Sequence, residues 1–577
     1  MARRMKAQQG AASIPKLGHD LIARSRFAAP SGERAPESTR LDSGRRRILL
    51  TVGFFALAFS IVTGRLVTLG MAPYGDDADN QVAAASVPEP EQRRDIVDRN
   101  GEVMATDIIT ASLYADARKV MDPKETARLL ATALPGLDRD GLEEKLSSDR
   151  AFVWLKRDMT PREQVAVHNL GQPGLGFQRE QKRVYPNGHM ASHVLGGVDV
   201  DNRGIAGIEY YMEQAGDLSD GPLALSIDLR VQHALRSELL AGIEEFSAKA
   251  ATGVVLDITT GEVIALSSLP DFDPNDPTGS PERARFNAAT LGVYEMGSTF
   301  KAFTVAAALD SGEVQLATEY DAREPIRVSH FTINDYHAQK RFLSVPEIFM
   351  HSSNIGTAKM VLDLGREAHR NFLGELGLLT RADIELPESG SPLLPRRWTD
   401  ISAMTISYGH GLSVTPLQAV TASAALVNGG YAVEPTFLRQ EHVLPRVRVL
   451  QQSTSDAMRA LLRLVVERGT GRNADVVGYP VMGKTGTAEK PVEGGYSRKA
   501  LLTSFMSAFP ANDPRYAMLI LFDEPQPTAD SYGYATAGWN AAPVTSRVVR
   551  RIAPILGLRP VEYWDAPVQA ASLLAAE

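Results

Sequence analysis

The chain has 577 residues, a formal net charge of −8 and no cysteine. Its length suggests roughly two to four domains, and its acidic balance gives no reason to expect nucleic acid as a partner. The lack of cysteine excludes disulfides, thiol nucleophiles and thiolate metal sites.

The N-terminal region predicts a tail followed by a membrane anchor. Residues 1–47 are rich in Arg, Lys, Ser, Pro and Ala, a composition typical of a disordered basic tail. The apolar run from Ile48 to about Met71 is long enough for a hydrocarbon core, which needs roughly 20 residues. Arg45, Arg46 and Arg47 precede it, so the positive-inside rule places the tail in the cytoplasm and the rest of the chain outside.

Two features of this region leave alternatives open. A cleaved signal peptide with its cleavage site at Val82–Ser86 would also explain the apolar run, but the long basic leader argues against it. Arg65 interrupts the apolar run. It either extends toward the outer interface or pairs with a partner membrane protein.

The segment after the anchor predicts a linker and then a first extracytoplasmic domain. Residues 72–92 are polar and contain Pro88 and Pro90, which favours a linker. From 93 to 220, Asn100-Gly101 predicts a hairpin turn, and residues 123–134 and 161–170 show helical spacing of apolar residues. This domain contains no evident nucleophile–base pair, so we expect a non-catalytic pedestal that docks partners.

Residues 221–560 predict a second domain of the α+β class, and residues 561–577 a short C-terminal tail. Two strands, Gly253–Asp257 and Val263–Ser267, flank a turn, and two more, Leu502–Phe509 and Tyr516–Asp523, lie near the end. Mainly helical sequence separates the two pairs. This order predicts one antiparallel sheet assembled from distant segments, with a helical insert.

A serine and a lysine begin the insert. In "YEMGSTFKAFTVAAALDSG", Ala302–Leu309 predicts a helix that Gly312 ends. Ser298 lies at its start and Lys301 three residues on, so both side chains share one face. A partly desolvated lysine can act as base for a serine nucleophile. The same pattern would also occur at an ordinary helix start, with Ser298 as the capping residue and Lys301 on the surface.

Two further motifs follow along the chain. "FMHSSNIG" contains Ser352 and Asn354, and "GYPVMGKTGTAEK" begins at Gly478 and contains Lys484. The residues 478–485 also fit the phosphate-loop pattern of NTPases. However, Pro480 removes a loop amide, and the glycines and proline that follow make a helix unlikely, so we expect a short strand and no ATP binding.

The ordered set S-x-x-K, S-x-N and K-T-G is much rarer than its parts, and it resembles the motif set of penicillin-binding proteins. Other stretches resemble the class B members of that family, namely "RRDIVDRNGEVMA", "RVYPNG", "GIAGIEYYME", "SYGHGLSVTPLQ" and "GKTGTAEK". The resemblance covers about residues 48–560 and is nearest to the cell-division branch. It implies a penicillin-binding/β-lactamase-like transpeptidase domain on a mixed α/β pedestal with one transmembrane helix.

The resemblance also implies roles for site residues. Ser298 would attack the penultimate D-Ala carbonyl of a stem peptide, and Lys301 would accept its proton. Ser352 would relay protons to the leaving D-Ala with Lys484 nearby, and Asn354 would hold the substrate amide. The remaining implied residues belong to the substrate-binding strand and are Thr485, Gly486 and Thr487. The backbone N–H groups of Ser298 and Thr487 would form the oxyanion hole.

The implied function is septal peptidoglycan D,D-transpeptidation, inhibited by β-lactams. An elongation-type transpeptidase, a D,D-carboxypeptidase, a β-lactamase and a β-lactam sensor remain alternatives. The implied partners are stem peptides, the membrane, an FtsW-type membrane glycosyltransferase and other division proteins, with the enzyme in the bacterial inner membrane at the septum. No cofactor and no metal are expected, since no H-E-x-x-H pair occurs, and we expect His410 to be structural.

Overall fold

The structure is a computed structural model that describes residues 38–71, 93–216, 221–328, 331–442, 445–492 and 495–561. The chain divides into two compact units, residues 1–89 and 90–577. In the first unit, helix α1 (Ser38–Met71) contains an apolar stretch, Leu49–Val67, that by length and composition could cross a membrane. None of this stretch is buried inside the protein. The candidate cleavage site Val82–Ser86 and the linker 72–92 lie outside the described residues.

Helix α1 begins ahead of the expected start at Ile48. Residues 38–47, which we expected to be disordered, are helical, while residues 1–37 lie outside the described part of the chain. The reason is cooperativity: a helix that has formed in the apolar run extends at little cost until a residue stops it. The last proline of the tail is Pro36, just before the helix begins.

The N-terminal part of the second unit has a sheet built around one long strand, β2. Strand β2 pairs antiparallel with β1, β3 and β4, and β1 pairs parallel with β7. The hairpin predicted at Asn100-Gly101 is confirmed, with Gly101 at φ +90. The strands are β1 (Ile96–Val97), β2 (Val103–Ala115), β3 (Val153–Met159), β4 (Leu175–Val184), β5 (Gly197–Val198), β6 (Gly204–Ala206) and β7 (Leu223–Ala224).

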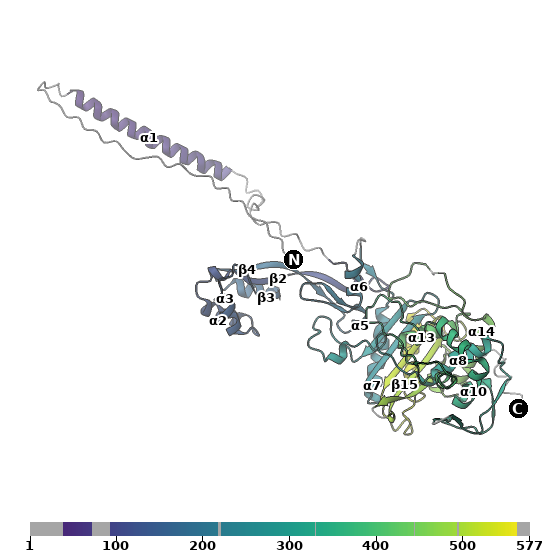
Figure 1. Cartoon of the computed structure of the whole chain (residues 1–577). Coiled ribbons are helices and arrows are strands. Elements are labelled where there is room, and N and C mark those ends of the chain that lie inside the picture. The colour runs from purple at the N-terminus through teal and green to yellow at the C-terminus, as the bar shows by residue number, and fades with distance from the viewer. Residues whose placement is uncertain are drawn as a thin grey trace, which may run out of the picture. The chain divides into compact units, whose positions relative to one another are not determined.

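Short helices cover the end of this sheet that is formed by strands β2, β3 and β4 (Figure 1). Helices α2 and α4 confirm the two predicted from apolar spacing, and Asp122 and Thr160 cap their N-termini. A small apolar core forms beneath them around Leu113, Leu130 and Leu155. Counting α5 and α6, which lie at the other end of the sheet, the helices of this part of the unit are η1 (Ala117–Lys119), α2 (Pro123–Ala133), α3 (Arg139–Leu146), α4 (Pro161–His168), α5 (Ser192–Leu195) and α6 (Gly207–Ala215).

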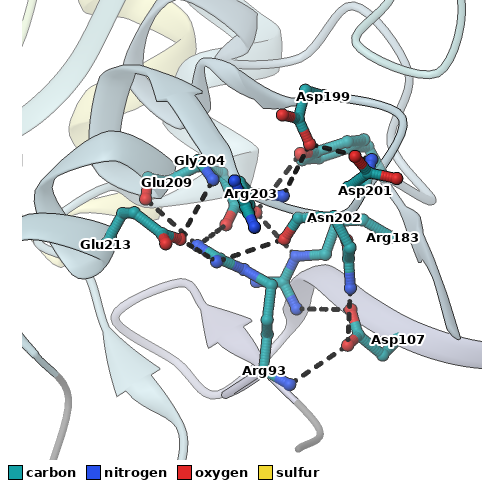
Figure 2. A network of polar contacts seen from close by, with 11 residues as sticks. Arg93, Asp107, Arg183, Asp199, Asp201, Asn202, Arg203, Gly204, Glu209 and Glu213 are labelled. Atoms are coloured by element: carbon teal, nitrogen blue, oxygen red, sulfur yellow. Dashed lines mark hydrogen bonds and ion pairs between the residues drawn. The ribbon is translucent and has the colours of Figure 1, made fainter. Parts of the chain in front are cut away.

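A buried ion-pair network joins β2, β4, α6 and the start of this unit. Arg183 Nε lies 2.6 Å from Glu209 Oε1, and Arg183 Nη1 lies 3.1 Å from Asp107 Oδ1. Arg93 reaches the other Glu209 oxygen at 3.0 Å and Glu213 at 2.6 Å. Figure 2 shows the two arginines converging on these carboxylates. Since the network connects four segments, it fixes how the chain enters this unit.

The C-terminal part of the unit contains a five-stranded sheet in the order β14-β15-β16-β8-β9, with every neighbouring pair antiparallel. The predicted assembly of one sheet from distant segments is therefore confirmed. Strand β15 is longer than predicted, because it continues into a hairpin with β14. The strands are β8 (Ala250–Asp257), β9 (Val263–Leu269), β14 (Met482–Val492), β15 (Gly495–Phe509) and β16 (Tyr516–Asp523).

Both faces of this sheet are covered, which explains why β16 reads as a continuous apolar run. Its residues alternate between two cores: Ala517, Leu519 and Leu521 face one, and Met518, Ile520 and Phe522 face the other. Helices α7 (Leu229–Glu245) and α15 (Ala541–Ile555) pack on the second face.

The helical insert packs on the first face and fills the larger core. Figure 1 shows its helices α8, α10, α13 and α14 gathered beside β15. The helices are η2 (Glu282–Arg285), η3 (Gly297–Phe300), α8 (Lys301–Asp310), α9 (Val345–His351), α10 (Asn354–Leu364), α11 (Arg366–Glu375), α12 (Asp400–Ser407), α13 (Pro416–Ala425), α14 (Gln452–Glu467) and η4 (Arg472–Ala474). Short strands between them are β10 (Glu319–Asp321), β11 (Ile326–Val328), β12 (Phe331–Ile333) and β13 (Phe342–Ser344).

Candidate active site

The serine and lysine of the first motif meet at the N-terminus of α8. Ser298 lies in the 3₁₀ turn η3, and Lys301 opens the helix one turn later. Lys301 Nζ lies 2.7 Å from Ser298 Oγ. The lysine is entirely buried, and burial lowers its pKa well below the ordinary value, with the charge of Lys484 adding to this and Asp335 opposing it. A neutral amine is therefore favoured beside the hydroxyl.

The second motif lies at the junction of α9 and α10. Ser352 has the left-handed backbone (φ 59) that ends α9, and Ser353 caps α10 by accepting from Gly356 N at 3.0 Å. Asn354 then begins α10, and its Oδ1 accepts from Lys301 Nζ at 2.7 Å. The tight turn between the helices thus brings Ser352 and Asn354 to the same site as Lys301.

The third motif supplies a second buried lysine. Lys484 lies on β14, and its Nζ donates to Ser352 Oγ at 2.9 Å and to the Thr485 carbonyl at 3.2 Å. Burial lowers the pKa of Lys484 to about 7. Each lysine is therefore paired with its own serine, Lys301 with Ser298 and Lys484 with Ser352.

Lys484 lies in a strand, as predicted, but this strand is 11 residues long and not the short strand that was expected. Residues 482–492 form strand β14, so Lys484 and Thr485 lie within a strand and do not open a helix as a phosphate loop requires. Gly478 lies before the strand with φ +84 and faces Pro560. Its match to the NTPase pattern has no structural counterpart.

Gly486 has a packing role on β14. A Cβ at this position would lie 2.5 Å from the Met296 carbonyl oxygen and 2.8 Å from Thr299 Cγ2. Gly297 is equally tight, because a Cβ there would lie 2.7 Å from the Thr487 oxygen. The two glycines thus let the turn that carries Ser298 rest directly on β14.

The two threonines of the third motif both have partners in the protein. Thr485 Oγ1 lies 2.6 Å from Thr470 Oγ1, and this side chain is buried. Thr487 Oγ1 accepts from the backbone of Ala537 at 3.3 Å. Both residues lie where the sequence placed them, on the strand beside Ser298, with Thr487 the more exposed of the two.

Several residues around the site were missed by the sequence analysis. Asp335 contacts the second motif, Tyr408 places its ring 5.8 Å from Lys301 Nζ, and Thr470 contacts Thr485. None of them belongs to a local motif. The only signal for Tyr408 was its place in "SYGHGL", where His410 had been noted. His410 lies between the rings of Tyr408 and Tyr496, and burial lowers its pKa.

Among the described residues, no group of three or more His, Asp or Glu side chains is placed to hold a metal ion. What the site does contain is a serine hydroxyl next to a desolvated amine, which is the combination needed for covalent acyl transfer. The fold and the site therefore define a serine enzyme class with a lysine in the position of the base.

Comparison with known proteins identifies the family. The model of the penicillin binding protein transpeptidase domain matches residues 251–549, and that of the penicillin-binding protein dimerisation domain matches residues 88–215. The chain belongs to the class B penicillin-binding proteins.

Curated relatives and a solved structure agree with this assignment. The chain is 42% identical to the probable peptidoglycan D,D-transpeptidase FtsI of Caulobacter vibrioides, over 90% of each chain. It is 31% identical to the probable transpeptidase PenA of Neisseria gonorrhoeae, over 90% of this chain and 94% of the relative. Its fold is similar to penicillin binding protein 3 of Mycobacterium tuberculosis, solved with aztreonam, with a TM-score of 0.64 and 23% identity, covering 81% of this chain and 97% of the other.

Proposed function

We propose that this protein is a serine-type peptidoglycan D,D-transpeptidase that cross-links stem peptides through an acyl-enzyme on Ser298. The observation that carries the proposal is the buried Lys301 amine, 2.7 Å from the Ser298 hydroxyl. The 42% identity to a protein named as such a transpeptidase supports the choice of substrate.

Acylation follows from this geometry. Ser298 Oγ gives its proton to Lys301 Nζ and forms a bond to the penultimate D-Ala carbonyl carbon. The C–N bond to the terminal D-Ala breaks, and its nitrogen takes up the proton that Lys301 had accepted, relayed through Ser352, which Lys484 contacts at 2.9 Å. The amine of a second stem peptide then attacks the ester, forms the new amide and returns the Ser298 hydroxyl.

Other residues of the site would bind the substrate. Asn354 Nδ2 donates one N–H to the Asn334 carbonyl at 2.9 Å, and its second N–H is available for a peptide carbonyl. Thr485 and Thr487 would hold the terminal carboxylate on β14, next to Gly486. The backbone N–H groups of Ser298 and Thr487 would stabilise the oxyanion, an element worth about 10²–10³ in rate per donor.

Labelling with benzylpenicillin tests the nucleophile. We expect mass spectrometry to find a single adduct, on the peptide that contains Ser298, and none in Ser298→Ala. An adduct on another residue, or persistent labelling of the variant, would overturn the assignment.

Labelling does not separate a transpeptidase from a D,D-carboxypeptidase, a β-lactamase or a β-lactam sensor, because all of them acylate. An assay with lipid-linked substrate and a glycosyltransferase does. We expect cross-links that depend on acceptor peptide. Release of D-Ala without cross-links would favour the carboxypeptidase, and neither product would favour the sensor.

We also propose that the enzyme acts at the division septum of the bacterial inner membrane, anchored by α1 with its catalytic domain outside. Residues 93–220 would form the pedestal, which together with the anchor would dock an FtsW-type glycosyltransferase and other division proteins. The similarity to FtsI of Caulobacter vibrioides supports this choice over an elongation enzyme. Depletion in the native host should leave growing cells that fail to constrict, with a fluorescent fusion at mid-cell. Bulging cells with the fusion along the side wall would contradict the septal role.

A further inference from the structure

A chain of buried polar contacts lies behind the candidate active site. It consists of His369 on α11, Thr304 on α8 and Ser407 at the end of α12, each with 0% of its surface exposed. His369 Nε2 lies 3.1 Å from Thr304 Oγ1, and the same hydroxyl donates to the Ser407 carbonyl at 3.0 Å. Two hydrogen bonds therefore connect three helices that are distant in sequence.

The hydroxyl of Thr304 determines which group donates in each bond. It has a single hydrogen, which it gives to the Ser407 carbonyl, so toward His369 it can only accept. His369 must therefore donate from Nε2–H. Its ring is neutral, because burial lowers its pKa to about 3, and Nδ1 is buried with no hydrogen-bond partner among the described residues.

This histidine is an expensive residue for its surroundings. Its neighbours on α11, Phe372 and Leu373, belong to the same apolar core as Phe303 on α8. An apolar side chain in place of His369 would fill this core without leaving a buried nitrogen unpaired, which costs stability. Buried polar contacts that persist at such a cost fix one arrangement of the elements that they join.

The end of α12 that is held in this way contacts both parts of the first motif. Tyr408 directly follows Ser407, and its ring centre lies 5.8 Å from Lys301 Nζ. Gly409 comes next, and its carbonyl accepts from Gly297 N at 3.2 Å. A Cβ at Gly409 would lie 1.9 Å from the Gly297 oxygen, so the two backbones are in direct contact. A shift of Ser407 would thus disturb both contacts.

We propose that His369 is a positioning residue for acylation: through Thr304 it holds the Ser407 carbonyl, and so keeps the Tyr408 ring beside Lys301 and the following backbone against η3. An aromatic face attracts a cation within about 6 Å of its centre. Tyr408 held in this place stabilises the ammonium group that forms when Lys301 accepts the serine proton. This inference rests on the proposed function, in which Lys301 is the base.

The test is acylation of the full-length protein in detergent by benzylpenicillin, followed over a range of concentrations. In His369→Leu and in Thr304→Val we expect the rate constant at saturation to fall about 10-fold, the effect of one lost hydrogen bond. The half-saturating concentration should stay that of the parent. The double variant should be no slower than the slower single variant, because both side chains act through the same bond.

Two conservative variants and one control complete the experiment. His369→Gln keeps an N–H donor and Thr304→Ser keeps the hydroxyl, so both should retain most of the parent rate. Thr545→Val is the matched control: this hydroxyl is also fully buried and donates to the Ala541 carbonyl at 2.8 Å, but it lies on α15, on the opposite face of the sheet. Its removal should leave acylation unchanged.

The outcomes separate the possibilities. A rate constant for His369→Leu within about twofold of the parent overturns the proposal. An equal fall in His369→Gln and Thr304→Ser also overturns it, because the effect would then depend on side-chain shape and not on the hydrogen bond. If His369→Leu does not fold, Thr304→Val carries the test, with Thr304→Ser as its rescue. A parent protein that is not acylated at Ser298 would instead contradict the proposed function.

Discussion

At the scale of residues, the site is organised by two buried amines with different surroundings. Both Lys301 and Lys484 are fully buried, and burial lowers the pKa of each. Lys301 contacts a serine and an amide oxygen, whereas Lys484 contacts a serine and a backbone carbonyl. Since desolvation favours the uncharged amine, the fold favours neutral amines at both positions, where a surface lysine would be charged.

The change Lys301→Met tests this arrangement. The apolar side chain fills a similar volume and removes a buried amine, so we expect unchanged or higher thermal stability. Acylation by benzylpenicillin should fall about 10²- to 10⁴-fold, the usual contribution of a general base. Lys490→Met is the control, because Lys490 pairs with Asp523 and Glu524 on the outer part of the sheet. A Lys301→Met variant that acylates within a few-fold of the parent is not consistent with Lys301 as the base.

At the scale of elements, the position of Ser298 depends on how closely η3 approaches β14. The approach needs glycine on both sides, since a Cβ at Gly297 or Gly486 would meet backbone oxygen at 2.7 or 2.5 Å. Real Cβ atoms are essentially never found this close to such atoms. The distance between Ser298 and β14 is therefore set by backbone packing.

We expect Gly486→Ala to displace η3 from β14. The added methyl should cost about 1–3 kcal/mol of stability, as overpacking usually does, while acylation of Ser298 should fall far more than this loss explains. Gly374→Ala in α11 is the control, because a Cβ there has only an ordinary 3.8 Å contact with Leu379. If a folded Gly486→Ala acylates like the parent, the close approach does not matter for catalysis.

A second element-scale prediction concerns the ion network in Figure 2. The change Arg183→Ala leaves the carboxylates of Asp107 and Glu209 buried with fewer partners, at 1% and 0% side-chain exposure. We expect a loss of about 3–5 kcal/mol in the unfolding free energy of this part of the chain, measured with denaturant. The exposed pair Arg128–Glu125 provides the comparison: Arg128→Ala should have no measurable effect. If Arg183→Ala lowers the unfolding free energy no more than Arg128→Ala does, the buried network is not stabilising.

At the scale of the whole molecule, two buried histidines make stability depend on pH. Burial lowers the pKa of His193 to about 4 and that of His369 to about 3. Both are neutral when folded. His193 Nε2 contacts the Ala284 carbonyl, which opposes the lowering of its pKa without reversing it, and His369 Nε2 contacts Thr304. The unfolded chain binds these protons near pH 6.5. Stability is thus full above about 6.5 and is lost as pH falls toward the folded pKa values.

We therefore expect the unfolding midpoint in denaturant to drop between pH 7.5 and pH 4.5. Each histidine should contribute about 2–3 kcal/mol to the change. In His369→Asn the pH-dependent loss of stability should be smaller by about 2–3 kcal/mol. His168→Asn is the control: His168 is exposed, and its replacement should leave the pH dependence unaltered. A His369→Asn variant with the full pH dependence of the parent would show that this histidine is not responsible.

The amino-acid sequence alone determined the α+β class, the apolar segment near the N-terminus, two of the strand pairs in the sheet of the C-terminal part, and the three motifs that contain Ser298, Lys301, Ser352, Asn354 and Lys484. These features follow from local periodicity, from turn residues and from a rare ordered set of short motifs. Each of these signals lies within a short stretch of the sequence.

Only the tertiary structure decided how these pieces meet. Asp335 and Thr470 join the site through contacts between segments distant in sequence, and the reason for Gly486 is a backbone oxygen from another element. The buried state of Lys301 and Lys484, and hence their lowered pKa, likewise comes from the packing of helices and sheet around them. Such effects depend on distances in space, and the sequence of a single chain does not encode these distances locally.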